Sequence, residues 1–113
     1  FATAGGRAML SLLDDRHVDD ILRRSKLVPL TPKTLIDAGL IRQRVEEARR
    51  DGYAWVQEES LLGEIVIAAP VTRDRTMPAG AIHIAGSLAD WTADEFRRRF
   101  APLAIEAARA LSS

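Results

Sequence analysis

The chain has 113 residues, 47% of them hydrophobic and 28% charged, which is enough to bury the core of one soluble domain. Its 16 basic and 16 acidic residues cancel, which excludes the net positive field that attracts duplex DNA or anionic lipid. The absence of cysteine excludes disulfides, thiolate metal sites and cysteine nucleophiles together, and it fits a cytoplasmic protein. The longest apolar run, residues 65–71, is far shorter than the roughly 20 residues of a membrane span.

The first element is a helix that Thr3 is predicted to cap. Gly5 and Gly6 keep its first turn free of side chains, so that N–H donors are exposed at the positive end of the helix dipole. The first ten residues contain no charged segment followed by an apolar one, so they are not a signal peptide and instead look like the start of a helix within a longer polypeptide.

Two more helices are predicted before residue 53. One covers about residues 16–25 and carries an apolar face of Val18, Ile21 and Leu22. A loop over residues 27–36 follows, because prolines interrupt it. Asp37 then caps a helix that ends at Gly52, with Ile41, Val45 and Ala48 facing inward.

Three strands are predicted over residues 53–57, 64–72 and 80–87, with a hairpin over residues 73–78. Residues two apart share a face of a sheet. One face therefore holds the bulky residues Tyr53, Trp55, Ile65, Ile67, Ile82 and Ile84. The opposite face holds smaller residues and one histidine, namely Val56, Val66, Ala68, His83, Ala85 and Ser87. The second face leaves room for a ligand, whereas the first is suited to packing under helices.

The last helix has a clear start. Thr92 and Glu95 form a capping box, and Trp91 can pack on Phe96. Helical spacing predicts that Phe96, Phe100, Leu103, Ala107 and Leu111 lie against the sheet. Pro102 predicts a kink near residues 98–102.

Four segments in a fixed order carry a family resemblance: residues 1–10 (FATAGGRAML), 30–34 (LTPKT), 52–71 (GYAWVQEESLLGEIVIAAPV) and 102–110. The chain resembles the effector-binding domain of the IclR (isocitrate lyase regulator) family of bacterial transcription factors. The resemblance implies an α+β domain of the GAF and PAS sensor class, with an antiparallel sheet that carries helices on one face and a pocket on the other. It also implies that residues 1–113 are a partial effector domain, that an earlier part of the domain adds strands to the sheet, and that a separate winged helix–turn–helix, absent from this chain, binds DNA.

The family resemblance also implies a site. The family holds a small carboxylate with a Gly-Ala pair at the helix start, which corresponds to Ala4 and Gly5 within the turn Thr3–Gly6. Its Asp, Cys and two Ser positions correspond to Val56, Val66, His83 and Ala85. Because most of those polar side chains are replaced, the effector is expected to be an organic acid with a larger hydrophobic or aromatic body than glyoxylate or pyruvate. A helix start can still bind the carboxylate through backbone N–H groups.

An alternative is a small enzyme that uses His83 as a general base in the same cleft, but no second catalytic group is placed by the sequence. Glu58 and Glu59 point to opposite faces of a strand, so they are interpreted as a solvated turn and not as an acid–base pair. His17 and His83 have no third metal ligand near them in the sequence, so neither a metal nor a cofactor is expected. The run Arg97–Arg99 is interpreted as a solvent-facing surface.

The expected partners follow from the family. They are a small organic acid, DNA only through the separate domain, no membrane, and a second copy of the chain in a homodimer or homotetramer.

Overall fold

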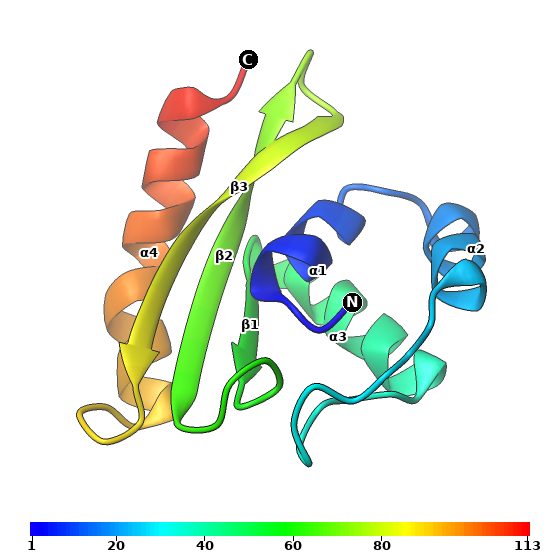
Figure 1. Cartoon of the computed structure of the whole chain (residues 1–113). Coiled ribbons are helices and arrows are strands. Elements are labelled where there is room, and N and C mark those ends of the chain that lie inside the picture. The colour runs from blue at the N-terminus through cyan, green and yellow to red at the C-terminus, as the bar shows by residue number, and fades with distance from the viewer.

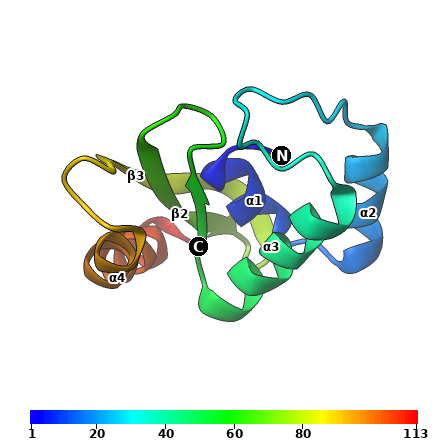
Figure 2. The same ribbon diagram turned by 90° about the horizontal axis from the view of Figure 1, so that it is seen from below.

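The computed structural model describes residues 1–113 as four helices and three strands: α1 (Ala4–Leu10), α2 (Asp15–Arg24), α3 (Ala38–Asp51), β1 (Ala54–Gln57), β2 (Glu64–Arg73), β3 (Met77–Ser87) and α4 (Ala93–Leu111). The strands form one antiparallel sheet in the order β1-β2-β3. Figures 1 and 2 show α4 on one face of this sheet and α1 with α3 on the other, while α2 lies farther out against α3. The α+β class is confirmed. The face expected to carry the pocket is not free of helices, because α1 and α3 cover part of it.

Helices α1 and α3 begin directly after the capping residues predicted for them. Thr3 accepts a hydrogen bond from the Gly6 N–H at 3.0 Å, and Asp37 accepts one from the Leu40 N–H at 3.0 Å. Gly52 ends α3 with a φ of 84°, a conformation that glycine adopts without strain. One boundary differs: α2 begins at Asp15, because the side chain of Asp14 accepts the His17 N–H and caps it earlier than predicted.

The β2–β3 hairpin is tighter than predicted. β3 begins at Met77 and not at residue 80, because Asp74 and Arg75 turn the chain with φ values of 52° and 70°. The carboxyl end of the chain fastens this hairpin, since the Ser113 N–H bonds to the Thr72 carbonyl and the Ser113 carbonyl accepts the Arg75 N–H.

The core under α4 contains the predicted bulky face of the sheet. Ile65 and Ile67 are fully buried there against Phe96, and Trp91 meets Phe96 edge-to-face with ring centroids 6.1 Å apart. The remaining inward residues of α4 are Ala101, Ala104 and Ala108. These alanines let the helix approach the isoleucines closely, while Leu103 and Leu111 lie on its outer side.

The predicted inward face of α4 is therefore partly wrong. Phe96 is buried and Phe100 packs at the edge of the core, but Ala107 is exposed, and Leu103 and Leu111 are 54% and 64% exposed. The helix continues through Pro102, which lies on its exposed side.

The arginine run at the start of α4 packs on aromatic rings instead of only facing solvent. The Arg97 guanidinium lies 4.2 Å from the ring centre of Trp55, and its Nε donates to the Tyr53 hydroxyl at 3.1 Å. Arg99 lies over Trp91 and Phe100 at about 6 Å. This run thus borders the α4 core.

The opposite face of the sheet has a second core made of small side chains. Ala4 and Ala8 of α1 pack on Ala54, Val56 and Ala68 of the sheet, with Ala48 of α3 beside them. Because these side chains are short, the first turn of α1 lies directly on the strands. A third cluster joins α1, α2 and α3 through Leu10, Val18, Leu22, Ile41 and Val45.

Candidate functional site

The residues predicted to bind a ligand come together on the α1 face of the sheet. The strand register places Val56 opposite Val66 and Val66 opposite Ala85, so three of them form one row across the sheet. His83 lies in the next row, opposite Ala68. The first turn of α1, with Ala4 and Gly5 buried, packs against the same strands.

Gly5 and His83 are in direct contact. A Cβ added to Gly5 would lie 2.5 Å from Nε2 of His83, a separation that real Cβ atoms do not tolerate. The imidazole itself is exposed and makes no hydrogen bond. Glycine at this position therefore allows the ring to lie on the helix start, and the ring has free nitrogens for another molecule.

The donors at the helix start are fewer than the sequence suggests. The side chain of Thr3 accepts a hydrogen bond from the Gly6 N–H, and its carbonyl accepts one from the Arg7 N–H. The N–H groups of Ala4 and Gly5 have no hydrogen-bond partner. Since α1 has only 7 residues, these two groups and the His83 ring carry the polar character of the site more than the helix dipole does.

Two hollows lie on either side of His83 along β3. One, of about 330 Å³, is lined by Gly6 together with the mostly apolar Phe1, Met9, Leu10, Leu13, Ile21 and Pro78. The other, of about 400 Å³, is lined by Ala85 together with Leu61, Leu62, Gly63, Glu64, Gly86 and Ser87. Each hollow is lined by one of the eight predicted residues, Gly6 in the first and Ala85 in the second.

Two charged residues join α1 to the β1–β2 turn as a buried ion pair. Arg7 of α1 and Glu59 of the β1–β2 turn make two hydrogen bonds of 2.7 Å, with side chains 1% and 8% exposed. Glu59 also accepts the Leu35 N–H at 2.9 Å. The interpretation of this turn as solvated is therefore wrong for Glu59, which fastens α1 to the turn and to the 27–36 loop.

The neighbouring Glu58 is also engaged. Its carboxylate accepts a hydrogen bond from Lys33 at 2.9 Å and a second from the Gly63 N–H at 3.2 Å. These two hydrogen bonds lower the pKa of the Glu58 carboxyl. Glu58 and Glu59 thus have separate partners and do not converge on one bond. Nothing in the spacing of the sequence identifies Arg7, whose partner is 52 residues away.

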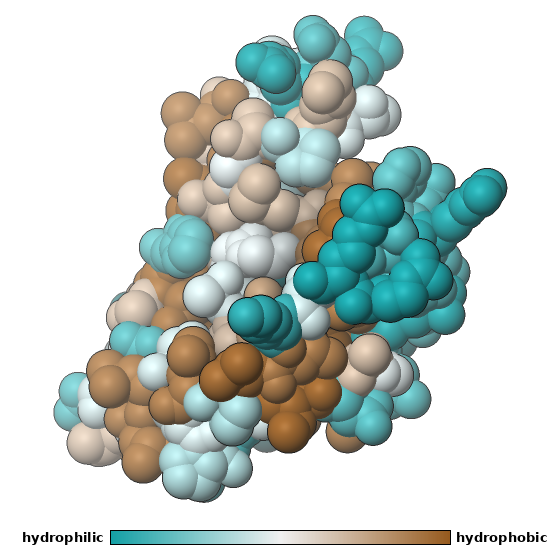
Figure 3. All heavy atoms as spheres, turned by 45° about the vertical axis from the view of Figure 1, so that its right-hand side comes forward, coloured by the Kyte–Doolittle hydropathy of each residue, from teal (hydrophilic) through white to brown (hydrophobic).

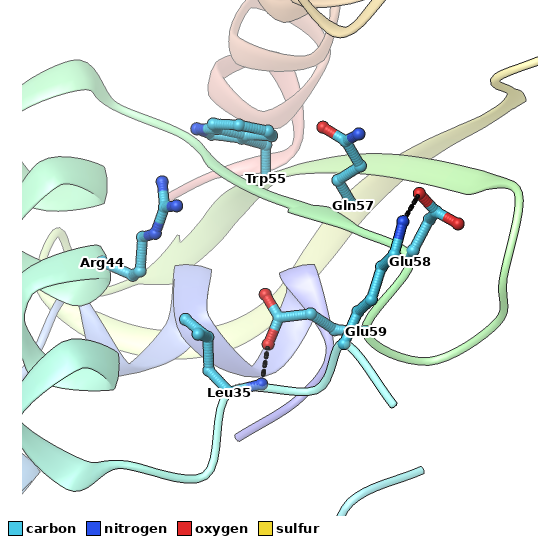
Figure 4. A pocket seen from close by; sticks show the side chains of 7 residues that line it. Leu35, Arg44, Trp55, Gln57, Glu58 and Glu59 are labelled. Carbon is cyan, nitrogen blue, oxygen red and sulfur yellow. Dashed lines mark hydrogen bonds and ion pairs between the residues drawn. The ribbon is translucent and has the colours of Figure 1, made fainter. Parts of the chain in front are cut away.

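A third hollow, of about 240 Å³, lies at the β1 edge and is lined by Lys33, Leu35, Arg44, Trp55, Gln57, Glu58 and Glu59. Figure 4 shows Trp55 and Gln57 projecting from β1 and the Glu59 carboxylate turned to the backbone of Leu35. Arg44 lies 5.1 Å from the centre of the Trp55 ring. Because its carboxylates already have partners and none of the eight predicted residues lines it, this hollow is not the predicted site.

Glu64 is the residue on the candidate face that sequence reasoning missed. It is two residues before Val66 and pairs with Ser87 in the sheet register, so it extends the same face beyond Ala85. The two-residue periodicity that selected Val66 also selects Glu64.

Elsewhere the chain has no group of three or more His, Cys, Asp or Glu side chains placed to hold a metal ion. His17 is hydrogen-bonded to Asp14 through Nδ1 at 2.9 Å. No helix combines the length and the hydropathy that a membrane span requires.

Known proteins are similar to this chain in sequence and in fold. The model of the family described as bacterial transcriptional regulator IclR C-terminal matches residues 1–113. The repressor AllR of Salmonella paratyphi A is 33% identical over 95 residues, which cover 84% of this chain and 35% of AllR. The repressor IclR of Escherichia coli K12 is 30% identical over 108 residues, covering 96% of this chain and 39% of IclR.

A solved structure agrees with these relatives. The inducer-binding domain of the PobR transcription factor from Acinetobacter, a double mutant in complex with 3-hydroxybenzoic acid, has a TM-score of 0.88 and 26% identity, over 99% of this chain and 64% of that one.

The chain spans little more than a third of the curated relatives it matches. These relatives are transcriptional repressors and not enzymes, which argues against His83 as a catalytic base. The chain belongs to the IclR family of bacterial transcriptional regulators, in which it corresponds to the C-terminal, ligand-binding domain.

Proposed function

We propose that this chain is the sensor of an IclR-type regulator, which binds a small organic acid and controls DNA binding by a separate winged helix–turn–helix domain. The observation that carries the proposal is the meeting of the α1 start with the small-residue face of the sheet, at the contact between Gly5 and His83. The 3-hydroxybenzoic acid in the similar PobR complex supports an aromatic acid as the ligand class.

The proposed pose uses the eight predicted residues. The acid group lies at the turn of Thr3, Ala4, Gly5 and Gly6, where two N–H groups have no protein partner, and beside the His83 ring. The body of the effector lies along Val66 and Ala85, in the row that Val56 continues beneath α1. To enter, the ligand displaces the imidazole from Gly5, so binding and the rotamer of His83 are coupled.

The assembly and location are part of the same proposal. We propose a homodimer or homotetramer in the cytoplasm. The family resemblance supports this association.

Calorimetry with benzoate as the probe tests the site. The parent chain is expected to bind it, whereas Gly5→Leu blocks the helix start and abolishes binding. His83→Ala weakens binding by about 0.5–3 kcal/mol, the range of one hydrogen bond.

Gly5→Ala supplies a matched control for the contact itself. Its Cβ forces the His83 ring away, and the double change Gly5→Ala/His83→Ala restores the space. Equal affinity of the parent and Gly5→Leu contradicts the pose, and recovery of the ligand chemically altered after incubation contradicts the sensor in favour of an enzyme.

A further inference from the structure

The candidate face has a polar end that the predicted residues do not include. Along β2 and β3, the opposed pairs on this face are Ala68 with His83, Val66 with Ala85, and Glu64 with Ser87. The last pair lines the hollow of about 400 Å³ that Ala85 also lines. Glu64 is thus separated from His83 by one row of small apolar residues.

The Glu64 carboxylate is unlike its acidic neighbours. Glu58 is bonded to Lys33 and Glu59 to Arg7, whereas the half-buried side chain of Glu64 has no hydrogen bond or ion pair with the protein. An ionised carboxylate only accepts hydrogen bonds. Its unused oxygens are therefore suited to a hydroxyl or amino donor and repel a second carboxylate.

The surroundings of Glu64 are hydrophobic on the outer side. Leu61 and Leu62 are 61% and 54% exposed and line the same hollow. Figure 3 shows hydrophobic side chains gathered at the lower end of the molecule, where the β1–β2 turn lies in Figure 1. A ligand whose hydroxyl or amino group reaches Glu64 therefore needs an apolar body to contact these leucines.

The spacing matches one substituted ring. Ser87 lies opposite Glu64 and is four residues from His83 on β3. At roughly 3.3 Å per residue, the row of Glu64 is therefore about 13 Å from the row of His83. A hydrogen bond of about 2.8 Å at each end leaves roughly 7 Å between the polar ends of the ligand. A single ring with an acid group at one end and a donor at the other has this size.

We propose that Glu64 determines the specificity of the sensor by accepting a hydrogen bond from the end of the effector opposite its acid group. The effector class is then a hydroxy- or amino-substituted aromatic acid, and neither a diacid nor an alkyl-substituted acid. The assignment rests on the proposed function, since it takes the acid end to lie at Gly5 and His83.

Three ligands of matched shape test the assignment: 4-hydroxybenzoate, 4-methylbenzoate and terephthalate. Calorimetry on the parent chain should show 4-hydroxybenzoate bound on the order of tenfold more tightly than 4-methylbenzoate, as expected for a hydrogen bond to a charged group. Terephthalate should bind most weakly, because its second carboxylate faces Glu64.

Two variants of Glu64 and one control complete the design. Glu64→Leu should remove or reverse the preference for hydroxyl over methyl, and Glu64→Gln should improve terephthalate binding. Glu106→Gln, which removes an exposed and unpaired carboxylate on α4, should leave all three affinities unchanged.

The outcomes separate the two proposals. If the ratio of the affinities for 4-hydroxybenzoate and 4-methylbenzoate is the same in the parent and in Glu64→Leu, the role of Glu64 is overturned, while the proposed sensor function still stands. Failure of all three acids to bind the parent overturns the proposed function, and the role of Glu64 with it.

Discussion

The two faces of the sheet are built on opposite principles. Under α4, isoleucines and a phenylalanine are buried against a helix of alanines, and aromatic rings with stacked arginines border this core. Under α1, the buried side chains are mostly alanines and valines, a buried ion pair lies beside them, and β3 is left exposed at His83 and Ala85. The α4 face therefore holds the larger buried side chains, while the α1 face, with its shorter side chains, is the one on which we propose that the effector binds.

The largest effect is expected from a substitution that creates a cavity in the core under α4. Phe96→Ala should cost about 3–5 kcal/mol of unfolding free energy, because Phe96 is 1% exposed at the centre of that core. His83→Ala on the other face should change stability by only about 0.5 kcal/mol, since the ring is exposed. Urea unfolding followed by circular dichroism measures both, and equal losses would remove the distinction between the faces.

The ion pair on the α1 face should be costly to break from one side. Arg7→Leu leaves Glu59 buried without its partner and should destabilise the domain by about 3 kcal/mol. In Arg7→Leu/Glu59→Leu both charges are gone, so stability should recover in part. If the double variant is less stable than the single one in thermal unfolding, the pair does not act as a unit.

The packing of α4 can be tested at two adjacent residues. Ala104→Leu inserts a large side chain where the helix touches the isoleucines and should cost about 1–3 kcal/mol. Leu103→Ala removes an exposed side chain and should stay within about 0.5 kcal/mol. The reverse order of these losses in chemical denaturation would restore the helix face predicted from sequence.

The smallest effect is expected at Asp15, which joins α2 to α3. Hydrogen bonds from Arg49 and then Arg42, each 2.9 Å long, lower the pKa of Asp15 below its ordinary value of 3.8. A lowered carboxylate pKa stabilises the folded state above pH 3.8 and ceases to do so as the pH falls through the folded-state pKa. Asp15→Asn should therefore lower the Tm slightly at pH 7, and the difference from the parent should disappear in acid. A difference that persists at low pH would show that the two arginines are not the cause.

Sequence periodicity predicted the parts of the fold that depend on neighbouring residues. Caps at Thr3, Asp37 and Thr92 and the two faces of β2 were confirmed, because capping and strand alternation are local rules. The predicted inward face of α4 was wrong. Leu103 and Leu111 recur at helical spacing, as core residues do, but the alanines that allow the close approach to the sheet recur at the same spacing and are the ones that face it. The Arg7–Glu59 pair and the Gly5–His83 contact join distant segments, so no local pattern predicted them.

The most direct test of the ligand face is nuclear magnetic resonance of the ¹⁵N-labelled chain titrated with 4-hydroxybenzoate. We predict that the amide signals of Gly5, Val66, His83 and Ala85 shift with increasing ligand, while those of Ala104 and Ala108 under the opposite face do not. Shifts centred on α4, or in the hollow around Arg44 and Trp55, would contradict a ligand site on the α1 face.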